Sequence, residues 1–218
     1  MSLARGLERR LERLVDGLAA RLFRGSLHPV ELGTRLVREA DLGVTETEAG
    51  PAVPNRYVVT VGSPPDDSTA VHELESELAA VVEETAAERG WRLEGPVEVA
   101  IRSGEGAAAS GEIESAFGPG DLSMWATLIP DSSDSGRVLL RHNRAVLGRS
   151  ATADGHIADD RASRRHALIW RQEGSIWLAD LESSNGTIVN GVRITSTVEL
   201  ANRDHISFGG AGHRLESI

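Results

Sequence analysis

Short β-prone runs separated by turn residues fill the sequence from residue 124 to its end. The runs recur about every 8–12 residues, with Gly, Asn and Asp between them, and this spacing predicts an all-β sandwich. A sandwich places its loops where a rigid scaffold can position binding residues. The predicted strands are Met124–Ile129, Val138–His142, Ala145–Gly148, His166–Arg171, Ser175–Leu181, Thr187–Val189, Ile206–Phe208 and Arg214–Ile218.

The first half of the chain has a different pattern, in which apolar residues recur at helical spacing. Leucines from Leu3 to Leu22 follow one another at steps of three or four and predict an amphipathic helix that ends at Gly25. Its apolar face could dock on its own domain, on a partner or on a membrane surface. The other predicted elements are a helix from His28 to Glu39, a loop from Gly43 to Asn55, a strand from Arg56 to Gly62, a helix from Thr69 to Arg89 capped by Ser68, and strands Val97–Arg102 and Gly111–Phe117.

This order, α-α-β-α-β-β, predicts a small α+β domain. The sequence Gly118-Pro119-Gly120 then separates the two patterns. We therefore expect an α+β domain over residues 1–117, a linker over residues 118–122 and a β-sandwich domain over residues 123–218.

Composition excludes several classes of function. The absence of cysteine rules out disulfides and thiolate chemistry. Residues 1–122 carry the whole net charge of −10, which disfavours nucleic-acid binding by the chain. We expect a cytoplasmic protein without direct membrane insertion, because no apolar run could span a bilayer and the first residues lack signal-peptide features. No metal-ligand spacing and no P-loop, Rossmann or hydrolase motif occurs, so we expect no metal, no cofactor and no enzymatic activity.

Three short motifs follow one another in the β half of the chain. A predicted strand ends in Gly148-Arg149, the run Ser163-Arg164-Arg165-His166 leads into another strand, and Ser183-Ser184-Asn185-Gly186 precedes a third. Each motif alone fits a simpler interpretation, namely a solvated arginine, a turn beside a core histidine, or an ordinary hairpin turn. Their occurrence together, in this order and at suitable spacing, indicates a common site.

With these motifs, residues 123–218 resemble a forkhead-associated (FHA) domain, a β-sandwich that binds phosphothreonine peptides. The resemblance implies that the residues in contact with the phosphopeptide are Arg149, Ser163, Arg164, Ser184 and Asn185. Ser163 and Ser184 would meet the phosphate, Arg164 the phosphate or the peptide backbone, and Asn185 the peptide main chain. The residues implied to give structural support are Gly148, His166 and Gly186. Ser184 stands where the family usually has threonine, so the site keeps the hydroxyl and lacks a methyl group.

These residue types suit the chemistry of phosphothreonine, which carries nearly two negative charges and three acceptor oxygens. Arginine offers a planar fork that never loses its proton, and serine offers a short hydroxyl donor. Each hydrogen bond to a charged group contributes about 1.5–3 kcal/mol. After the cost of ordering a peptide, roughly −8 kcal/mol remains, which corresponds to about micromolar affinity.

Residues 1–117 resemble the conserved N-terminal domain of FhaA-type actinobacterial proteins. The matching pieces are Leu7–Arg13, Phe23–Pro29, Val53–Thr60 and Gly90-Trp91-Arg92. This resemblance implies a role in Ser/Thr kinase signalling, in cell-wall or cell-division regulation. It also implies a phosphorylated membrane-protein partner that recruits the chain to the membrane.

The combined hypothesis is a non-catalytic adaptor that binds a phosphothreonine-containing kinase or kinase substrate. The alternative is a scaffold whose N-terminal domain binds the partner and whose FHA pocket is inert. A third hypothesis, RNA binding by the first half, rests on a loose likeness to KH-type topology. The missing GXXG loop and the negative charge count against it.

Overall fold

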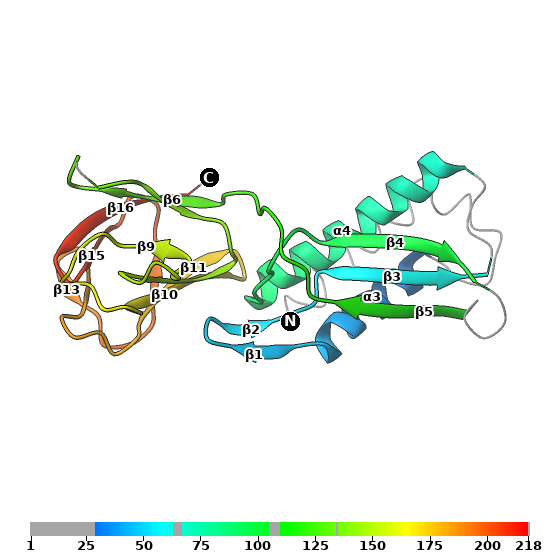
Figure 1. Ribbon diagram of the computed structural model, residues 1–218, viewed down its shortest axis with the longest axis horizontal. Helices are drawn as coiled ribbons and strands as arrows, with labels where there is room; N and C mark the ends of the chain where they lie inside the picture. The colour runs from blue at the N-terminus through cyan, green and yellow to red at the C-terminus, as the bar shows by residue number, and fades with distance from the viewer. Residues whose placement is uncertain (1–28, 63–66, 105–109, 134, 218) are drawn as a thin grey trace. The chain divides into compact units, whose positions relative to one another are not determined.

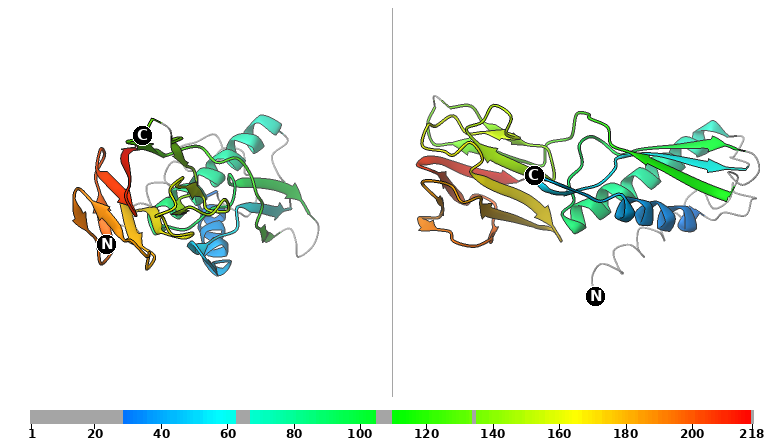
Figure 2. Two further views of the ribbon diagram at one scale, coloured as in Figure 1. Left: turned by 60° about the vertical axis from the view of Figure 1, so that its left-hand side comes forward. Right: turned by 60° about the horizontal axis from the view of Figure 1, so that its bottom comes forward.

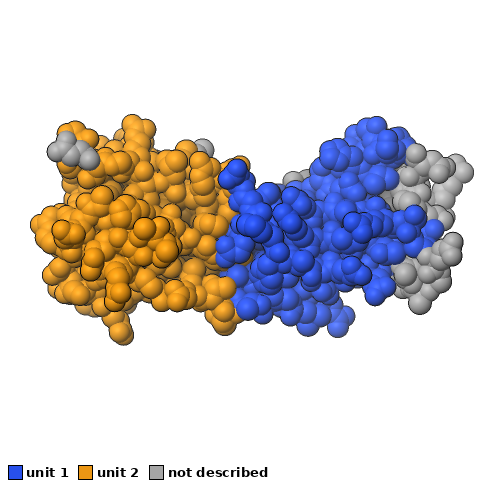
Figure 3. Space-filling view, in the orientation of Figure 1, with its two compact units in different colours: residues 1–45, 51–88, 93–121 blue, residues 46–50, 89–92, 122–218 orange. Residues whose placement is uncertain are grey.

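The computed structural model describes residues 29–62, 67–104, 110–133 and 135–217. The helix predicted from Leu3 to Leu22 lies outside these ranges. The chain divides into two compact units (Figure 3). Unit 1 comprises Met1–Thr45, Pro51–Glu88 and Leu93–Asp121, and unit 2 comprises Glu46–Gly50, Arg89–Arg92 and Leu122–Ile218. Helices and strands build the first unit and strands dominate the second, so the predicted fold class, α+β followed by all-β, is confirmed.

In the described residues, unit 1 is built on a three-stranded sheet with two helices on one face (Figures 1 and 2). Its strand order is β4-β3-β5, with β3 parallel to β4 and antiparallel to β5. A parallel pair needs a long crossover, and α4 supplies it. The elements of the first half are α3 (Pro29–Leu42), β1 (Thr45–Thr47), β2 (Gly50–Ala52), β3 (Arg56–Val61), α4 (Ser68–Arg89), β4 (Glu98–Ser103) and β5 (Ser110–Ala116).

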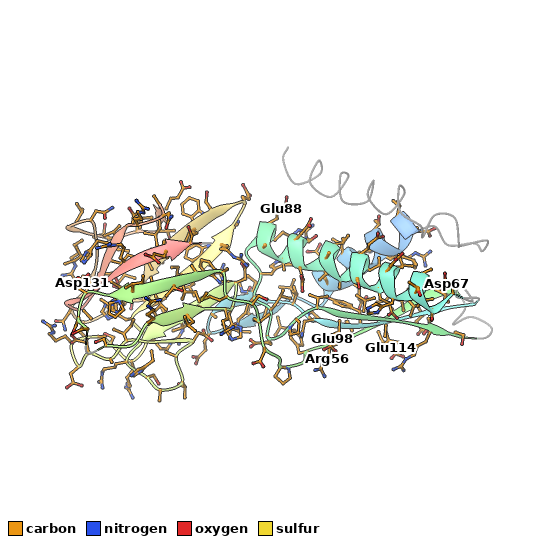
Figure 4. All side chains as sticks on the ribbon, turned by 90° about the horizontal axis from the view of Figure 1, so that it is seen from above. Arg56, Asp67, Glu88, Glu98, Glu114 and Asp131 are labelled. Carbon is orange, nitrogen blue, oxygen red and sulfur yellow. The ribbon has the colours of Figure 1, made fainter. Side chains whose placement is uncertain are left out.

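The two faces of this sheet differ in burial, because successive side chains of a strand point to opposite faces. Tyr57 and Val59 of β3 point to the helix side and are buried. Figure 4 shows Arg56, Glu98 and Glu114 on the face turned away from α4. None of the helices in the described ranges is long and apolar enough to cross a membrane.

Helix α4 begins with a different cap from the predicted one. The Asp67 carboxylate accepts a hydrogen bond from the Thr69 N–H at 2.9 Å, so Asp67 is the N-cap, Ser68 lies within the helix, and the predicted Ser68 cap is wrong. Figure 4 shows Asp67 at this end of α4. Adjacent aspartate and serine are nearly equal capping residues, so only the backbone geometry could distinguish them. Gly90, at a φ of 65°, follows the last helical residue as predicted.

The predicted loop from Gly43 to Asn55 is partly wrong, because β1 and β2 pair there as a short hairpin. The Thr47 hydroxyl donates to the Gly50 carbonyl at 2.7 Å and accepts from the Ala49 N–H at 3.2 Å. Both strands are only three residues long and one contains proline, so no period-two pattern marks them in the sequence.

Unit 2 is a sandwich of two sheets that enclose one apolar core. The strand orders are β14-β11-β10-β8-β9 and β13-β12-β15-β16-β6-β7. Fully buried side chains from both sheets, among them Leu147, Ile169 and Phe208, form the core. The strands are β6 (Ala126–Pro130), β7 (Val138–Leu140), β8 (Arg144–Gly148), β9 (Gly155–His156), β10 (Ala167–Gln172), β11 (Ser175–Asp180), β12 (Thr187–Val189), β13 (Val192–Arg193), β14 (Val198–Leu200), β15 (His205–Phe208) and β16 (Ala211–Ser217).

All eight strands predicted for this half are present, and their ends differ from the predicted ones by at most three residues. Strands β9, β13 and β14 were not predicted from the sequence. These strands have two or three residues each, which is too short to show alternation.

Residues from outside 122–218 take part in the packing of unit 2. The Arg92 guanidinium forms a bidentate ion pair with Asp154, at 2.9 and 3.0 Å. Arg144 donates to the Ala49 and Gly90 carbonyls at 2.7 and 3.0 Å. The same guanidinium lies over the Trp170 ring, 4.8 Å from its centroid. The short segments 46–50 and 89–92 are therefore part of this unit.

Candidate functional site

Three loops of unit 2 meet where the sequence motifs lie: after β8, before β10 and between β11 and β12. The Arg149 N–H donates to the Ser163 carbonyl at 3.0 Å, and the Ser150 N–H donates to the Arg164 carbonyl at 3.2 Å. The Ser184 N–H donates to the Ser163 hydroxyl at 3.0 Å. The backbones of the first two loops are thus joined, and the third loop is attached through a side chain.

The Ser163 hydroxyl is oriented by this last contact. Its oxygen accepts the Ser184 N–H, and the Ser163 proton stays available for another acceptor. The Ser184 side chain is exposed, and in the described part of the chain its own hydroxyl makes no hydrogen bond. Two hydroxyl donors therefore belong to residues that are in direct contact, one half-buried and one exposed.

Four arginines lie in the first two loops, and they differ in whether their charge is compensated. Arg161 is paired with Asp159 at 2.8 Å, and its hydrogen bond lowers the pKa of that carboxyl to about 2. Arg165 is paired with Glu48 at 3.4 Å. Arg149 and Arg164 are exposed, and no ion pair or side-chain hydrogen bond to either exists within the described ranges. Of these four arginines, Arg149 and Arg164 are therefore the two without a counter-charge among the described residues.

Asn185 extends the hydrogen-bonding surface. Its side-chain amide donates to the Arg161 carbonyl at 2.8 Å, which holds the third loop against the second. Among the residues that the structure describes, no donor reaches its side-chain oxygen. That oxygen can accept an N–H from an extended peptide.

His166 connects the second and third loops from inside the protein. The ring is fully buried, its Nδ1 accepts the Ser163 N–H at 2.9 Å, and its Nε2 donates to the Gly186 carbonyl at 3.2 Å. These partners assign the neutral tautomer with its proton on Nε2. Burial lowers the pKa of the imidazole, against the opposing effects of the Gly186 carbonyl and Asp180. A neutral ring with one acceptor and one donor is what both loops require.

Asp180, at the end of β11, organises the third loop and was not among the site residues predicted from the sequence. Its carboxylate accepts from the Ser183 N–H at 2.8 Å, from the Ser183 hydroxyl at 2.6 Å and from the Thr187 hydroxyl at 2.6 Å. The Ser183 hydroxyl in turn accepts the Gly186 N–H at 2.9 Å. Burial would raise the pKa of this carboxyl, but the hydrogen bonds from Ser183 and Thr187 outweigh burial and lower it. An aspartate three residues before a serine in a turn was the available signal.

Two glycines allow the loops to approach. A side chain at Gly148 would collide with the carbonyl oxygens of Ser163 and Arg164, so only glycine fits between the first two loops. Gly186 has a φ of 81°, and the guanidinium of Arg193 covers it. A Cβ at Gly186 would lie 2.5 Å from the Arg193 Cζ.

The hydroxyl and arginine cluster, made of Arg149, Ser163, Arg164 and Ser184, is exposed except at Ser163, which is half-buried. An open hollow of about 490 Å³ lies beside it, lined by Arg165, Asp180, Leu181 and Glu182. None of the residues predicted to bind the ligand lines this hollow. The cluster can therefore hold a charged group presented by an extended segment, which needs donors and cations but no enclosure.

Two family models match different parts of the chain. Residues 145–209 match the FHA domain model, so the sandwich of unit 2 is an FHA domain. Residues 5–114, just over half of the chain, match the model of the FhaA N-terminal domain. The chain belongs to the FhaA N-terminal domain family and carries an FHA domain after it. Both resemblances inferred from the sequence are confirmed.

One curated relative is the oxoglutarate dehydrogenase inhibitor of Corynebacterium diphtheriae, which is 38% identical over 73 residues, or 34% of this chain and 50% of that protein. The chain spans about half the length of this relative. Among solved structures, a domain from a study of phosphothreonine-dependent FHA interactions is 31% identical, with a TM-score of 0.40 over 43% of this chain and 97% of its own. The FhaA FHA domain, crystallised with the intracellular domain of Rv3910, is 32% identical, with a TM-score of 0.39 over 42% of this chain and 99% of its own.

Proposed function

We propose that this chain is an adaptor that binds a phosphothreonine-containing segment of a partner protein in a Ser/Thr kinase pathway. The observation that carries the proposal is the Ser163 hydroxyl, oriented by the Ser184 N–H and accompanied by two uncompensated arginines, Arg149 and Arg164. Hydroxyl donors and guanidinium groups together match the several acceptor oxygens and the double charge of a phosphate monoester. Membership of the FHA class supports the same ligand.

The rigidity of the cluster also supports this function. His166 and Asp180 hold the loops from inside the protein through short hydrogen bonds, while the Arg149 and Arg164 side chains remain exposed. A cluster whose backbone is already positioned loses little conformational entropy when a ligand binds. Most of the conformational entropy lost on binding is then lost by the partner's flexible segment. This loss favours the weak, reversible binding that a signalling contact needs.

The partner that we propose is a phosphorylated kinase or kinase substrate, such as a membrane protein that recruits this chain to the membrane. The process that we propose is cell-wall or cell-division regulation, as the resemblance to FhaA-type proteins implies. The competing scaffold hypothesis, in which the FHA surface is inert, predicts no dependence on phosphorylation. The two hypotheses therefore differ in whether phosphorylation of the partner changes its affinity for this chain.

The test is a titration of the whole chain with matched phosphorylated and unphosphorylated threonine peptides, followed by fluorescence anisotropy. The phosphorylated form should bind at least about tenfold more tightly, because each charge-assisted hydrogen bond contributes about 1.5–3 kcal/mol. Arg149→Ala should remove most of this difference. Arg149→Lys should restore only part of it, because an ammonium group cannot make two parallel hydrogen bonds.

The matched control is Arg214→Ala, which removes another exposed arginine, from β16. This variant should bind like the unmodified chain. Equal affinity for both peptides, or normal phosphopeptide binding by Arg149→Ala, would reject the proposal.

A further inference from the structure

A third uncompensated arginine lies beside the cluster and belongs to none of the three sequence motifs. Arg193 is the last residue of β13, an edge strand whose hairpin partner is β12. Its guanidinium lies against the Gly186 backbone, since a Cβ built there would be 2.5–2.6 Å from the Cζ, Nε and Nη2 atoms of Arg193. The side chain is exposed, and it makes no ion pair or hydrogen bond with any residue in the described ranges.

Arg193 lies outside the hydroxyl and arginine cluster but next to it in the fold. Gly186 follows Asn185 directly and is two residues beyond Ser184, whose N–H contacts the Ser163 hydroxyl. An extended chain advances about 3.3–3.6 Å per residue. A peptide with its phosphate at Ser163 and Ser184 would therefore bring a neighbouring side chain, one or two residues away, towards Arg193.

The local charge favours an acidic side chain there. Arg161 is neutralised by Asp159, and Arg165 is neutralised by Glu48. Three carboxylates at these loops have no cationic partner in the described part, namely Asp160, Glu182 and Asp180, whose neighbour His166 is neutral, and none of them pairs with Arg149, Arg164 or Arg193. A dianionic phosphate would engage Arg149 and Arg164, and Arg193 would still lack a counter-charge.

We propose that Arg193 is a specificity-determining residue, which pairs with an aspartate or glutamate close to the phosphothreonine of the partner. The preferred ligands of this FHA domain are then acidic phosphothreonine segments. This inference rests on the proposed function and adds the chemistry of the flanking sequence.

The experiment measures how the whole chain binds a neutral phosphothreonine peptide in which one aspartate is moved through each position on either side of the phosphorylated residue. At one or two neighbouring positions, aspartate should tighten binding by about three- to fivefold, the range expected for one exposed ion pair. The preference should weaken at high salt. Arg193→Gln should abolish it and leave the affinity for the neutral phosphopeptide unchanged.

Arg214→Gln serves as the matched control, because it removes the same charge from β16 of the same sheet. This variant should keep the aspartate preference. Retention of the preference in Arg193→Gln, or its absence in the unmodified chain, overturns the inference while leaving phosphothreonine binding intact. An equal loss for all phosphopeptides in Arg193→Gln also overturns it, because Arg193 would then contact the phosphate itself. If unphosphorylated peptides bind as well as phosphorylated ones, the proposed function fails and this inference fails with it.

Discussion

Replacing His166 by alanine tests whether one buried ring holds two loops of the site together. The substitution removes the acceptor of the Ser163 N–H and one of two donors to the Gly186 carbonyl, which still accepts from the Gly209 N–H at 3.2 Å. It also removes the ring that packs edge-on against Phe208, with centroids 5.7 Å apart.

These losses define the size of the effect. A buried donor left without an acceptor costs about 1–3 kcal/mol. Emptying a fully buried ring site adds about 2 kcal/mol or more, because the surroundings close only partly. We expect His166→Ala to lower the free energy of unfolding by roughly 3–5 kcal/mol, a large part of the stability of a small domain.

Urea denaturation followed by tryptophan fluorescence is the appropriate assay. The four tryptophans, Trp91, Trp125, Trp170 and Trp177, all lie in unit 2, so their emission reports the unfolding of that unit. His166→Asn should lose less than the alanine variant, because its amide oxygen can replace Nδ1 as the acceptor of the Ser163 N–H. A loss below about 1 kcal/mol in the alanine variant, or identical losses in both, would refute the bridging role.

Two further predictions concern the same network. Asp180→Ala leaves the Ser183 N–H and the buried Thr187 hydroxyl without an acceptor, so it should cost about 3 kcal/mol or more and weaken phosphopeptide binding; an unchanged urea midpoint would contradict this. Burial lowers the pKa of His166 and His213, so the unfolded chain takes up protons below about pH 6.5 before the folded chain does, and stability should fall as the pH drops below that value. Denaturation midpoints that rise on acidification would show that these rings are not held neutral.

The candidate site could be located from the sequence because its residues lie in three short motifs. Each motif joins a turn to a strand, and the strands Ala145–Gly148 and Thr187–Val189 were visible as β-prone runs. The hairpin of β1 and β2 could not be predicted from the sequence. Its two three-residue strands are stabilised by pairing with each other and not by local β preference. The cap of α4 was misplaced by one residue for a similar reason, since Asp67 and Ser68 have nearly equal capping preference.

The charge state of the site could not be obtained from the sequence. Five arginines occur in or beside the motifs, and they differ in whether a carboxylate neutralises them. Arg161 and Arg165 have carboxylate partners, whereas the other three form no ion pair in the described part of the chain. The partner of Arg165, Glu48, is distant in sequence, so no local pattern indicates the pair. The uncompensated arginines are Arg149, Arg164 and Arg193.

By itself, the sequence determined the two fold classes, the family resemblance and the residue types that gather at one end of the sandwich. These properties depend on local periodicity and on the order of the motifs, both of which can be read directly from the amino-acid sequence. Only the tertiary structure decided which arginines keep their charge free, that Asp180 orders the third loop, and that Arg193 lies over Gly186. Such properties depend on atoms brought together by sheet pairing across long sequence separations, and no local signal encodes them.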